Sequence, residues 1–179
     1  MNEKIIQAKA PELSVSCWFN APEQISLNAL HGKTVVLLAF QMLCPGCVAH
    51  ALPQAKRIRQ AFSLDQLEVI GLHTVFEHHN AMTPVSLEAF LHEYQISFPV
   101  GVDKALGGSN IPRTMTLYEM EGTPSLILID QQGRKRKQYF GQVSDIMIGA
   151  EISTLLVEGN QSNFLDFSYE TGNTCHLVG

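Results

Sequence analysis

The stretch of sequence that decides the fold runs from Thr34 to Cys47 and reads Thr-Val-Val-Leu-Leu-Ala-Phe, Gln-Met-Leu, Cys-Pro-Gly-Cys. Residues 35–40 are continuously apolar and begin with β-branched side chains, which is typical of a central strand that is covered on both faces. After Cys47, apolar side chains recur at helical spacing at Val48, Ala51, Leu52, Ala55, Ile58 and Phe62. The sequence therefore places Cys44-Pro45-Gly46-Cys47 between a buried strand and the start of a helix.

A dithiol in this position can form a disulfide and reopen it. The unpaired backbone amides and the dipole at a helix N-terminus favour a thiolate on the first cysteine, so we predict that Cys44 is the nucleophile. Cys47 would lie one turn into the helix and be more shielded, which fits the resolving thiol that releases a reduced substrate. These residues predict thiol–disulfide exchange.

The composition indicates one folded domain. The chain has 179 residues, of which 45% are hydrophobic and 16% charged, which suits a single buried core. The net charge of −5 gives no basic footprint for nucleic acid. The one cationic cluster, residues 134–137, follows a Gln-Gln-Gly turn and is predicted to be the solvated rim of a hairpin.

Two features bear on the cellular setting. The N-terminus has no apolar core of signal-peptide length, and no later stretch approaches about 20 apolar residues. We therefore expect a soluble, cytoplasmic protein without a membrane or nucleic-acid partner. Four cysteines in that setting argue against a disulfide scaffold and for catalytic or metal-binding thiols.

The remaining pattern predicts an α/β fold with a mixed central sheet and helices on both faces, because strands and helices alternate before a closing hairpin. We divide the single domain into an N-terminal β-hairpin extension (1–33), a core (34–157) and a polar, irregular tail (158–179). Within the core we expect a strand at 67–75, a helix capped by Thr83, a short strand at 98–100, a hairpin at 122–141 and a last helix capped by Ser144. Pro53 is expected to kink the helix that follows the dithiol.

The chain resembles the thioredoxin-like superfamily, and within it the extended redoxin branch that includes the periplasmic cytochrome-maturation thiol oxidoreductases and the peroxiredoxin-like proteins. The resemblance rests on Ala10-Pro11-Glu12-Leu13, Leu30-His31-Gly32-Lys33, Val35 to Phe40, Cys44-Pro45-Gly46-Cys47 and Gly122-Thr123-Pro124. It implies a thioredoxin fold and disulfide oxidoreductase chemistry. It also implies that the Thr123–Pro124 peptide is cis and faces the dithiol, so that Thr123, Pro124, Pro45 and Gly46 shape a substrate groove.

The sequence departs from the thioredoxin pattern at two positions. Leu43 stands where thioredoxin has tryptophan, and Leu38 stands where it has a buried aspartate that moves protons. His50, three residues beyond Cys47, is the nearest titratable side chain that could help to deprotonate the resolving thiol. The alternative interpretation is a helix-surface histidine without a role.

Two further cysteines and a group of histidines lie outside the dithiol. Cys17 is predicted to be a buried structural thiol. Cys175, which precedes His176, could be an extra redox thiol or part of a mobile tail. His73, His78 and His79 share no ligand spacing with a carboxylate or cysteine, so no metal site is predicted there.

Three alternatives to the oxidoreductase remain open. A peroxiredoxin-like thiol peroxidase would need proline seven residues and threonine or serine three residues before its reactive cysteine. The sequence has Leu37 and Gln41 there for Cys44, and Phe40 and Cys44 there for Cys47. A zinc-binding module could use Cys44, Cys47, Cys175 and His176, and a purely structural adaptor would leave the thiols idle.

The leading interpretation requires no cofactor beyond an external thiol electron donor. Its partners would be a protein or small molecule that carries a disulfide, together with a thiol reductant.

Overall fold

A six-stranded mixed sheet forms the centre of the protein. The computed structural model describes residues 8–21 and 24–170, and the side chains as far as residue 160. The strand order is β1-β4-β3-β2-β5-β6. The bounds of the strands are Val15–Phe19 (β1), Thr34–Phe40 (β2), Leu67–His73 (β3), Val100–Asp103 (β4), Ser125–Ile129 (β5) and Lys135–Phe140 (β6).

The strand before the dithiol, β2, lies in the middle of this sheet. It pairs in parallel with β3 and antiparallel with β5, and every one of its seven residues is buried. A strand with neighbours on both edges and apolar layers on both faces has no position for a solvated side chain, which explains its continuous apolar run. The dithiol directly follows the carboxyl end of this buried strand, which fixes its position relative to the sheet.

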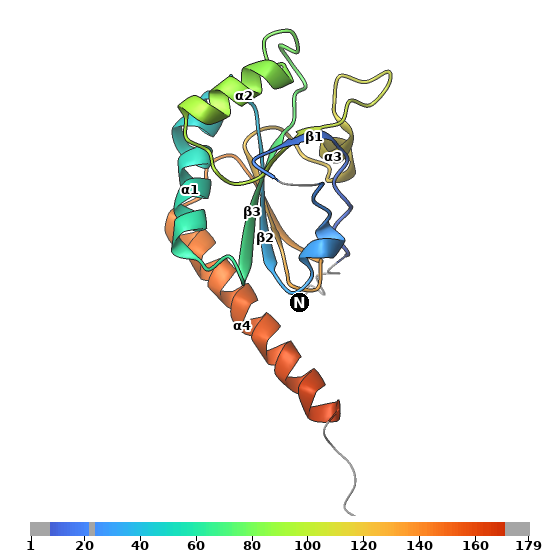
Figure 1. Ribbon diagram of the computed structural model, residues 1–179, viewed down its shortest axis with the longest axis vertical. Helices are drawn as coiled ribbons and strands as arrows, with labels where there is room; N and C mark the ends of the chain where they lie inside the picture. The colour runs from blue at the N-terminus through green and yellow to red at the C-terminus, as the bar shows by residue number, and fades with distance from the viewer. Residues whose placement is uncertain (1–7, 22–23, 171–179) are drawn as a thin grey trace, which may run out of the picture.

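The two faces of the sheet carry separate apolar clusters. Figure 1 shows α1 (Leu52–Ala61), α2 (Pro84–Glu93) and α4 (Asp145–Glu170) on one side and α3 (Arg113–Leu117) on the other. Alternate residues of β2 face the two clusters: Val36, Leu38 and Phe40 face the three long helices. Val35 and Leu37 face the layer formed by α3, the 3-10 helix η1 (Leu27–Leu30) and the N-terminal segment. The predicted mixed sheet with helices on both faces is confirmed.

The predicted N-terminal hairpin is wrong. In the described part of residues 1–33 the only strand is β1, and its partner is β4, with Phe19 opposite Val100. The segment after β1 forms η1 instead of a second strand, because the Ser26 hydroxyl caps a helical turn by accepting from the Ala29 amide. The N-terminal segment therefore adds an edge strand to the main sheet.

The C-terminal helix is longer than expected. It begins after Ser144, whose hydroxyl accepts from the Met147 amide at 3.2 Å as predicted, and continues to Glu170. The boundary that we placed at residue 158 therefore falls inside α4, and Figure 1 shows this helix extending beyond the sheet. Cys175 and His176 lie outside the described residues. Within the described residues, no helix combines the length and the apolar character that a membrane crossing needs.

Candidate active site

Cys44 occupies the N-cap of the helix that follows β2. Helical backbone geometry starts at Pro45, and the first helical hydrogen bond runs from the Val48 amide to the Cys44 carbonyl at 3.1 Å. The Cys44 Sγ accepts a hydrogen bond from the Cys47 amide at 3.2 Å, as an N-cap side chain does in a regular helix. Proline at the first helical position fits this start, since its missing N–H would have no helical partner there.

The helix then takes a wider turn before it becomes regular. Residues Cys47–Ala51 form a π-helical turn, η2, in which the Leu52 amide bonds back to the Cys47 carbonyl. Pro53 follows directly, as the second residue of α1. Since proline lacks the N–H that an α-helix would use and its ring crowds the preceding turn, the wider turn accommodates it. The kink that the sequence predicts at Pro53 takes this form of a local π turn.

The two cysteines have different surroundings. Cys44 is half-buried and Cys47 is fully buried, and both thiols are free in this structure. The pKa of Cys47 is raised to about 12, chiefly by burial and in addition by the hydrogen bond with Cys44. The Gln41 backbone and the Thr123 side chain form hydrogen bonds that act in the opposite direction and lower the Cys47 pKa. The unequal exposure predicted for the two cysteines is confirmed, and their roles as nucleophile and resolving thiol stay predictions.

The loop before β5 lies against the dithiol. The Thr123–Pro124 peptide is cis, as the resemblance implies. The Cys44 thiol donates to the Thr123 carbonyl at 3.5 Å, and a Cβ placed on Gly46 would lie 3.5 Å from Pro124 Cδ. The structure therefore brings together Cys44, Cys47, Gly46, Thr123 and Pro124.

Gln41 is a site residue that our interpretation of the sequence missed. Its side chain is buried, at 1% exposure, in the turn between β2 and the dithiol. The side-chain amide donates to Thr123 Oγ1 at 3.4 Å and to Glu77 Oε1 at 3.5 Å, while its oxygen accepts from the Phe76 amide at 3.2 Å. The signal that could have found it is a single polar residue at the end of an otherwise apolar strand, three positions before Cys44.

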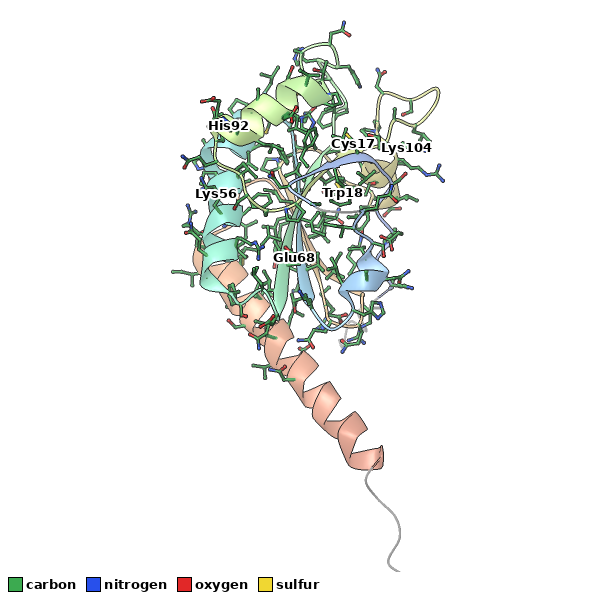
Figure 2. The ribbon with its side chains drawn as sticks, viewed as in Figure 1. Cys17, Trp18, Lys56, Glu68, His92 and Lys104 are labelled. Carbon is green, nitrogen blue, oxygen red and sulfur yellow. The ribbon has the colours of Figure 1, made fainter. Side chains whose placement is uncertain are left out.

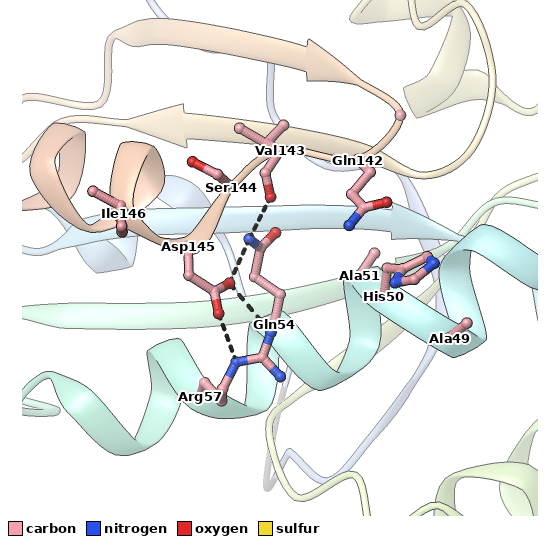
Figure 3. A pocket seen from close by; sticks show the side chains of 11 residues that line it. Ala49, His50, Ala51, Gln54, Arg57, Gln142, Val143, Ser144, Asp145 and Ile146 are labelled. Carbon is pink, nitrogen blue, oxygen red and sulfur yellow. Dashed lines mark hydrogen bonds and ion pairs between the residues drawn. The ribbon is translucent and has the colours of Figure 1, made fainter.

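His50 lies in the wall of a cavity whose lining includes neither Cys44 nor Cys47. The cavity has a volume of about 490 Å³ and is lined by η2, α1 and the segment that joins β6 to α4. Figure 3 shows Gln54 and Arg57 bonded to Asp145 in this cavity, with His50 apart from them. No hydrogen bond in the described residues joins His50 to either sulfur, so its role as a proton relay stays a prediction.

Cys17 lies far from the dithiol. Figure 2 shows Cys17 and Trp18 on β1, across the sheet from Lys56 on α1, and β4 and β3 separate β1 from β2. β1 therefore lies three strand spacings from β2, which at about 4.8 Å per spacing is about 14 Å. Cys17 is half-buried and not fully buried as predicted.

The cationic cluster on β6 is a set of ion pairs. Arg134 and Arg136 both bind Asp130, at 2.8 Å and 3.3 Å, and Arg136 also binds Glu158. Lys137 lies 3.7 Å from Glu151. These pairs compensate the positive charge, in agreement with a hairpin rim.

The structure groups no three His, Cys, Asp or Glu side chains in a way that could hold a metal ion, as far as the described residues extend. Two of the four ligands of the zinc alternative, Cys175 and His176, lie outside these residues.

The fold and the site together define a class: a thioredoxin-like protein with a dithiol at a helix start, facing a cis-proline loop. Comparison with known proteins agrees with this class. The model of the AhpC/TSA family matches residues 6–137. The chain belongs to this family, within the thioredoxin-like redoxin branch.

Two solved structures share half or more of the aligned sequence. A thioredoxin-like superfamily protein is 59% identical, with a TM-score of 0.81 over 83% of this chain and 96% of the other. A protein described as a thiol-disulfide isomerase from Corynebacterium glutamicum is 50% identical, with a TM-score of 0.79 over 82% of this chain and 96% of the other. The thioredoxin-like fold is thereby confirmed.

A curated relative is more distant. The thiol-disulfide oxidoreductase ResA of Halalkalibacterium halodurans is 27% identical over 127 residues, which make up 70% of this chain. The chain spans 64% of the length of that relative.

Proposed function

We propose that the protein is a thiol–disulfide oxidoreductase whose Cys44–Cys47 dithiol exchanges with disulfides in protein or small-molecule substrates. The observation that carries the proposal is the pairing of two unlike thiols at a helix start. The half-buried Cys44 sulfur accepts a hydrogen bond from the Cys47 amide at 3.2 Å, and the Cys47 thiol is fully buried. The names of the relatives support the same chemistry.

In the first half of the reaction, the Cys44 thiolate attacks one sulfur of the substrate disulfide. A bond forms between Cys44 Sγ and that sulfur, and the substrate disulfide breaks. The second substrate sulfur leaves as a thiolate and takes up a proton from solvent. The Cys47 amide that points at Cys44 Sγ is placed to stabilise negative charge on that sulfur before the attack.

In the second half, Cys47 loses its proton and attacks Cys44 Sγ. The Cys44–Cys47 disulfide forms, the mixed disulfide breaks, and the substrate leaves fully reduced with two electrons from the dithiol. An external thiol reductant then returns the dithiol to its reduced form. Because burial holds the Cys47 pKa at about 12, this half of the reaction depends on groups that help Cys47 to ionise.

The substrate would lie along the cis-proline loop. The Thr123 carbonyl is 3.5 Å from Cys44 Sγ, so it is placed to meet the backbone of a bound peptide. Two large apolar side chains close to the site residues are exposed: Leu43 directly precedes Cys44 in the sequence, and Phe140 packs against Gly122. We propose that Pro45, Gly46, Thr123 and Pro124 shape this groove, and that apolar side chains around it favour partly unfolded protein substrates.

We further propose that the protein works in the cytoplasm, where a reducing environment would keep the dithiol reduced between turnovers. No resident cofactor is needed for the steps above, since the dithiol carries both electrons.

The test measures disulfide reduction and peroxide consumption in parallel. Reduced protein is mixed with insulin and dithiothreitol, and separately with hydrogen peroxide and dithiothreitol, and each rate is compared with that of Cys44→Ser and Cys17→Ser variants. We expect catalysed insulin reduction that Cys44→Ser abolishes and Cys17→Ser leaves unchanged. If insulin reduction is uncatalysed while peroxide is consumed through Cys44, the peroxidase alternative is correct instead.

A further inference from the structure

If the protein has the function proposed above, Cys47 needs a neighbouring group that helps its thiol to ionise. Thioredoxin uses a buried aspartate for this purpose, and the corresponding position here, Leu38, is fully buried and apolar. Within the described residues, Cys44 is the titratable side chain that acts on Cys47 directly. The Glu77 carboxylate accepts a hydrogen bond from the Gln41 side chain at 3.5 Å.

The orientation of the Gln41 side chain follows from its partners. A backbone amide can only donate, so the Gln41 atom that lies 3.2 Å from the Phe76 nitrogen is its oxygen. The other end of the side chain is therefore the NH₂ group, which suits the Glu77 carboxylate at 3.5 Å. The same NH₂ group lies 3.4 Å from Thr123 Oγ1, so the Thr123 hydroxyl must accept there.

This acceptance determines what the Thr123 hydroxyl does with its own proton. A hydroxyl has one proton and two lone pairs, and Gln41 occupies a lone pair, which leaves the proton free to be donated. Thr123 lies at the dithiol, since its carbonyl oxygen is 3.5 Å from Cys44 Sγ, and its side chain acts to lower the pKa of Cys47, which is the sense that favours the thiolate. Gln41 therefore leaves the Thr123 hydroxyl with a proton that it can donate toward the dithiol.

We propose that Gln41 is a positioning residue for the second half of the exchange reaction: its side-chain amide directs the Thr123 hydroxyl as a hydrogen-bond donor toward Cys47. Cys47 is thereby stabilised as the thiolate that attacks Cys44 Sγ. Gln41 does not touch the substrate, and it acts through Thr123.

The test follows the two halves of the reaction separately with the chromogenic disulfide DTNB. All proteins carry Cys17→Ser and Cys175→Ser, so that only the dithiol reacts. Cys44 attacks DTNB and releases a first TNB thiolate at a rate that depends on DTNB concentration. Cys47 then attacks Cys44 Sγ and releases the second TNB thiolate at a rate that does not depend on it.

We expect Gln41→Leu and Thr123→Val to slow the second release about 3- to 10-fold at neutral pH. A lost hydrogen bond to a charged group raises a pKa by about one to two units. The greater nucleophilicity of a more basic thiolate compensates for about half of that effect. The first release should change less than about twofold, and Thr123→Ser, which keeps the hydroxyl, should retain the second rate.

The double variant decides whether Gln41 acts through Thr123. In Gln41→Leu/Thr123→Val, the second release should be no slower than in Thr123→Val alone, because the hydroxyl that Gln41 directs is already absent. Equal slowing by Gln41→Leu in both backgrounds would overturn the proposal, and so would an unchanged rate in Gln41→Leu itself.

Two further variants separate this role from a general effect on folding. Gln54→Leu removes another buried glutamine, which donates to the Val143 carbonyl and to Asp145, and it should leave the second rate unchanged. Gln41→Glu keeps the size of the side chain but replaces the donor by an acceptor, so it should slow the second release at least as much as Gln41→Leu. This variant tests the proposal if Gln41→Leu fails to fold.

Failure of the inference and failure of the proposed function give different results. If only one TNB is released from the protein with both dithiol cysteines, no Cys44–Cys47 disulfide forms and the proposed function is wrong. If two TNB thiolates are released and the second rate is the same with and without Gln41→Leu, only the role proposed for Gln41 is wrong.

Discussion

His73 makes the stability of this protein sensitive to acid. Its side chain is fully buried at the end of β3, and neither ring nitrogen has a hydrogen-bond partner. The ring packs against Phe40, with 5.4 Å between the ring centroids. Burial lowers the pKa of His73 from 6.5 to about 4, because a charged imidazolium at this position would have neither water nor an acceptor.

The sign and the size of the effect follow from the two pKa values. Between pH 6.5 and about 4 the unfolded chain binds a proton at His73 that the folded protein does not bind. Stability therefore falls as the pH falls through this window, and it is fully retained above it. The complete loss is about 3 kcal/mol, and most of it is reached at pH 4.5.

The perturbation is His73→Leu, which has a similar volume and cannot titrate. At pH 7.5 we expect its free energy of unfolding to lie within about 1 kcal/mol of the wild type, since the substitution removes two unpaired buried nitrogens. Between pH 7.5 and pH 4.5 the wild type should lose about 2 to 3 kcal/mol more than the variant. The control His79→Leu changes an exposed histidine and should lose as much as the wild type.

The assay is urea unfolding followed by circular dichroism at the two pH values, with all thiols kept reduced. Other acidic groups contribute to both proteins and cancel in the comparison. One of them is Asp103, whose pKa burial raises. Equal losses for the wild type and His73→Leu would refute the reasoning, since His73 would then be solvated or paired in the folded protein.

Three more predictions concern stability and are measured in the same unfolding assay at pH 7.5. Gln54→Leu should lower the free energy of unfolding by about 1–3 kcal/mol, because it leaves the buried Val143 carbonyl unpaired. Arg57→Ala should lower it by less than about 1 kcal/mol, because the ion pair of Arg57 with Asp145 is more than half exposed. A larger loss from Arg57→Ala than from Gln54→Leu would contradict this order. Asp103→Ala should cost about 2–4 kcal/mol, since the buried carboxylate accepts from two backbone amides at the start of α3 and from one hydroxyl; a loss below about 1 kcal/mol would show that α3 does not depend on this cap. Ser125→Ala should cost about 1–2 kcal/mol through its 2.7 Å bond to the Gly122 carbonyl, and an unchanged midpoint would contradict that value.

The parts of the fold that sequence predicts well are those with local signals. The continuous apolar run of β2 and the helical spacing after Cys47 identify the elements on both sides of the dithiol. Thr83 caps α2 by accepting a hydrogen bond from the Ser86 amide, and Pro84 is the first helical residue. These two adjacent residues are enough to predict where α2 begins. Ser144 does the same for α4.

The parts that sequence does not predict depend on contacts between distant residues. Alternating side chains identify β1 as a strand, but they do not show that its partner is β4 and not the following segment. The strand that we expected at 98–100 lies at Val100–Asp103, because Pro99 has no N–H for the sheet. The local pattern gives the element, and tertiary packing decides its partner and its limits.

The candidate site shows the same division. The spacing of Cys44 and Cys47 predicts the two thiols and their unequal burial. Gln41 escapes detection because its partners, Glu77 and Thr123, come from two other loops. No pattern in the sequence shows that His73 is buried without a partner, since the same residue in a different packing would bond a neighbour or water.

The central claim is that Cys44 forms a covalent bond with the sulfur of its substrate, which Cys47 then displaces. Intact mass analysis of the Cys47→Ser variant, after incubation with a disulfide-bonded peptide, tests it most directly. We predict one peptide attached through Cys44, which dithiothreitol releases. The double variant Cys44→Ser/Cys47→Ser should carry no peptide. A variant that carries no peptide, or that carries it on Cys17 alone, would contradict the account.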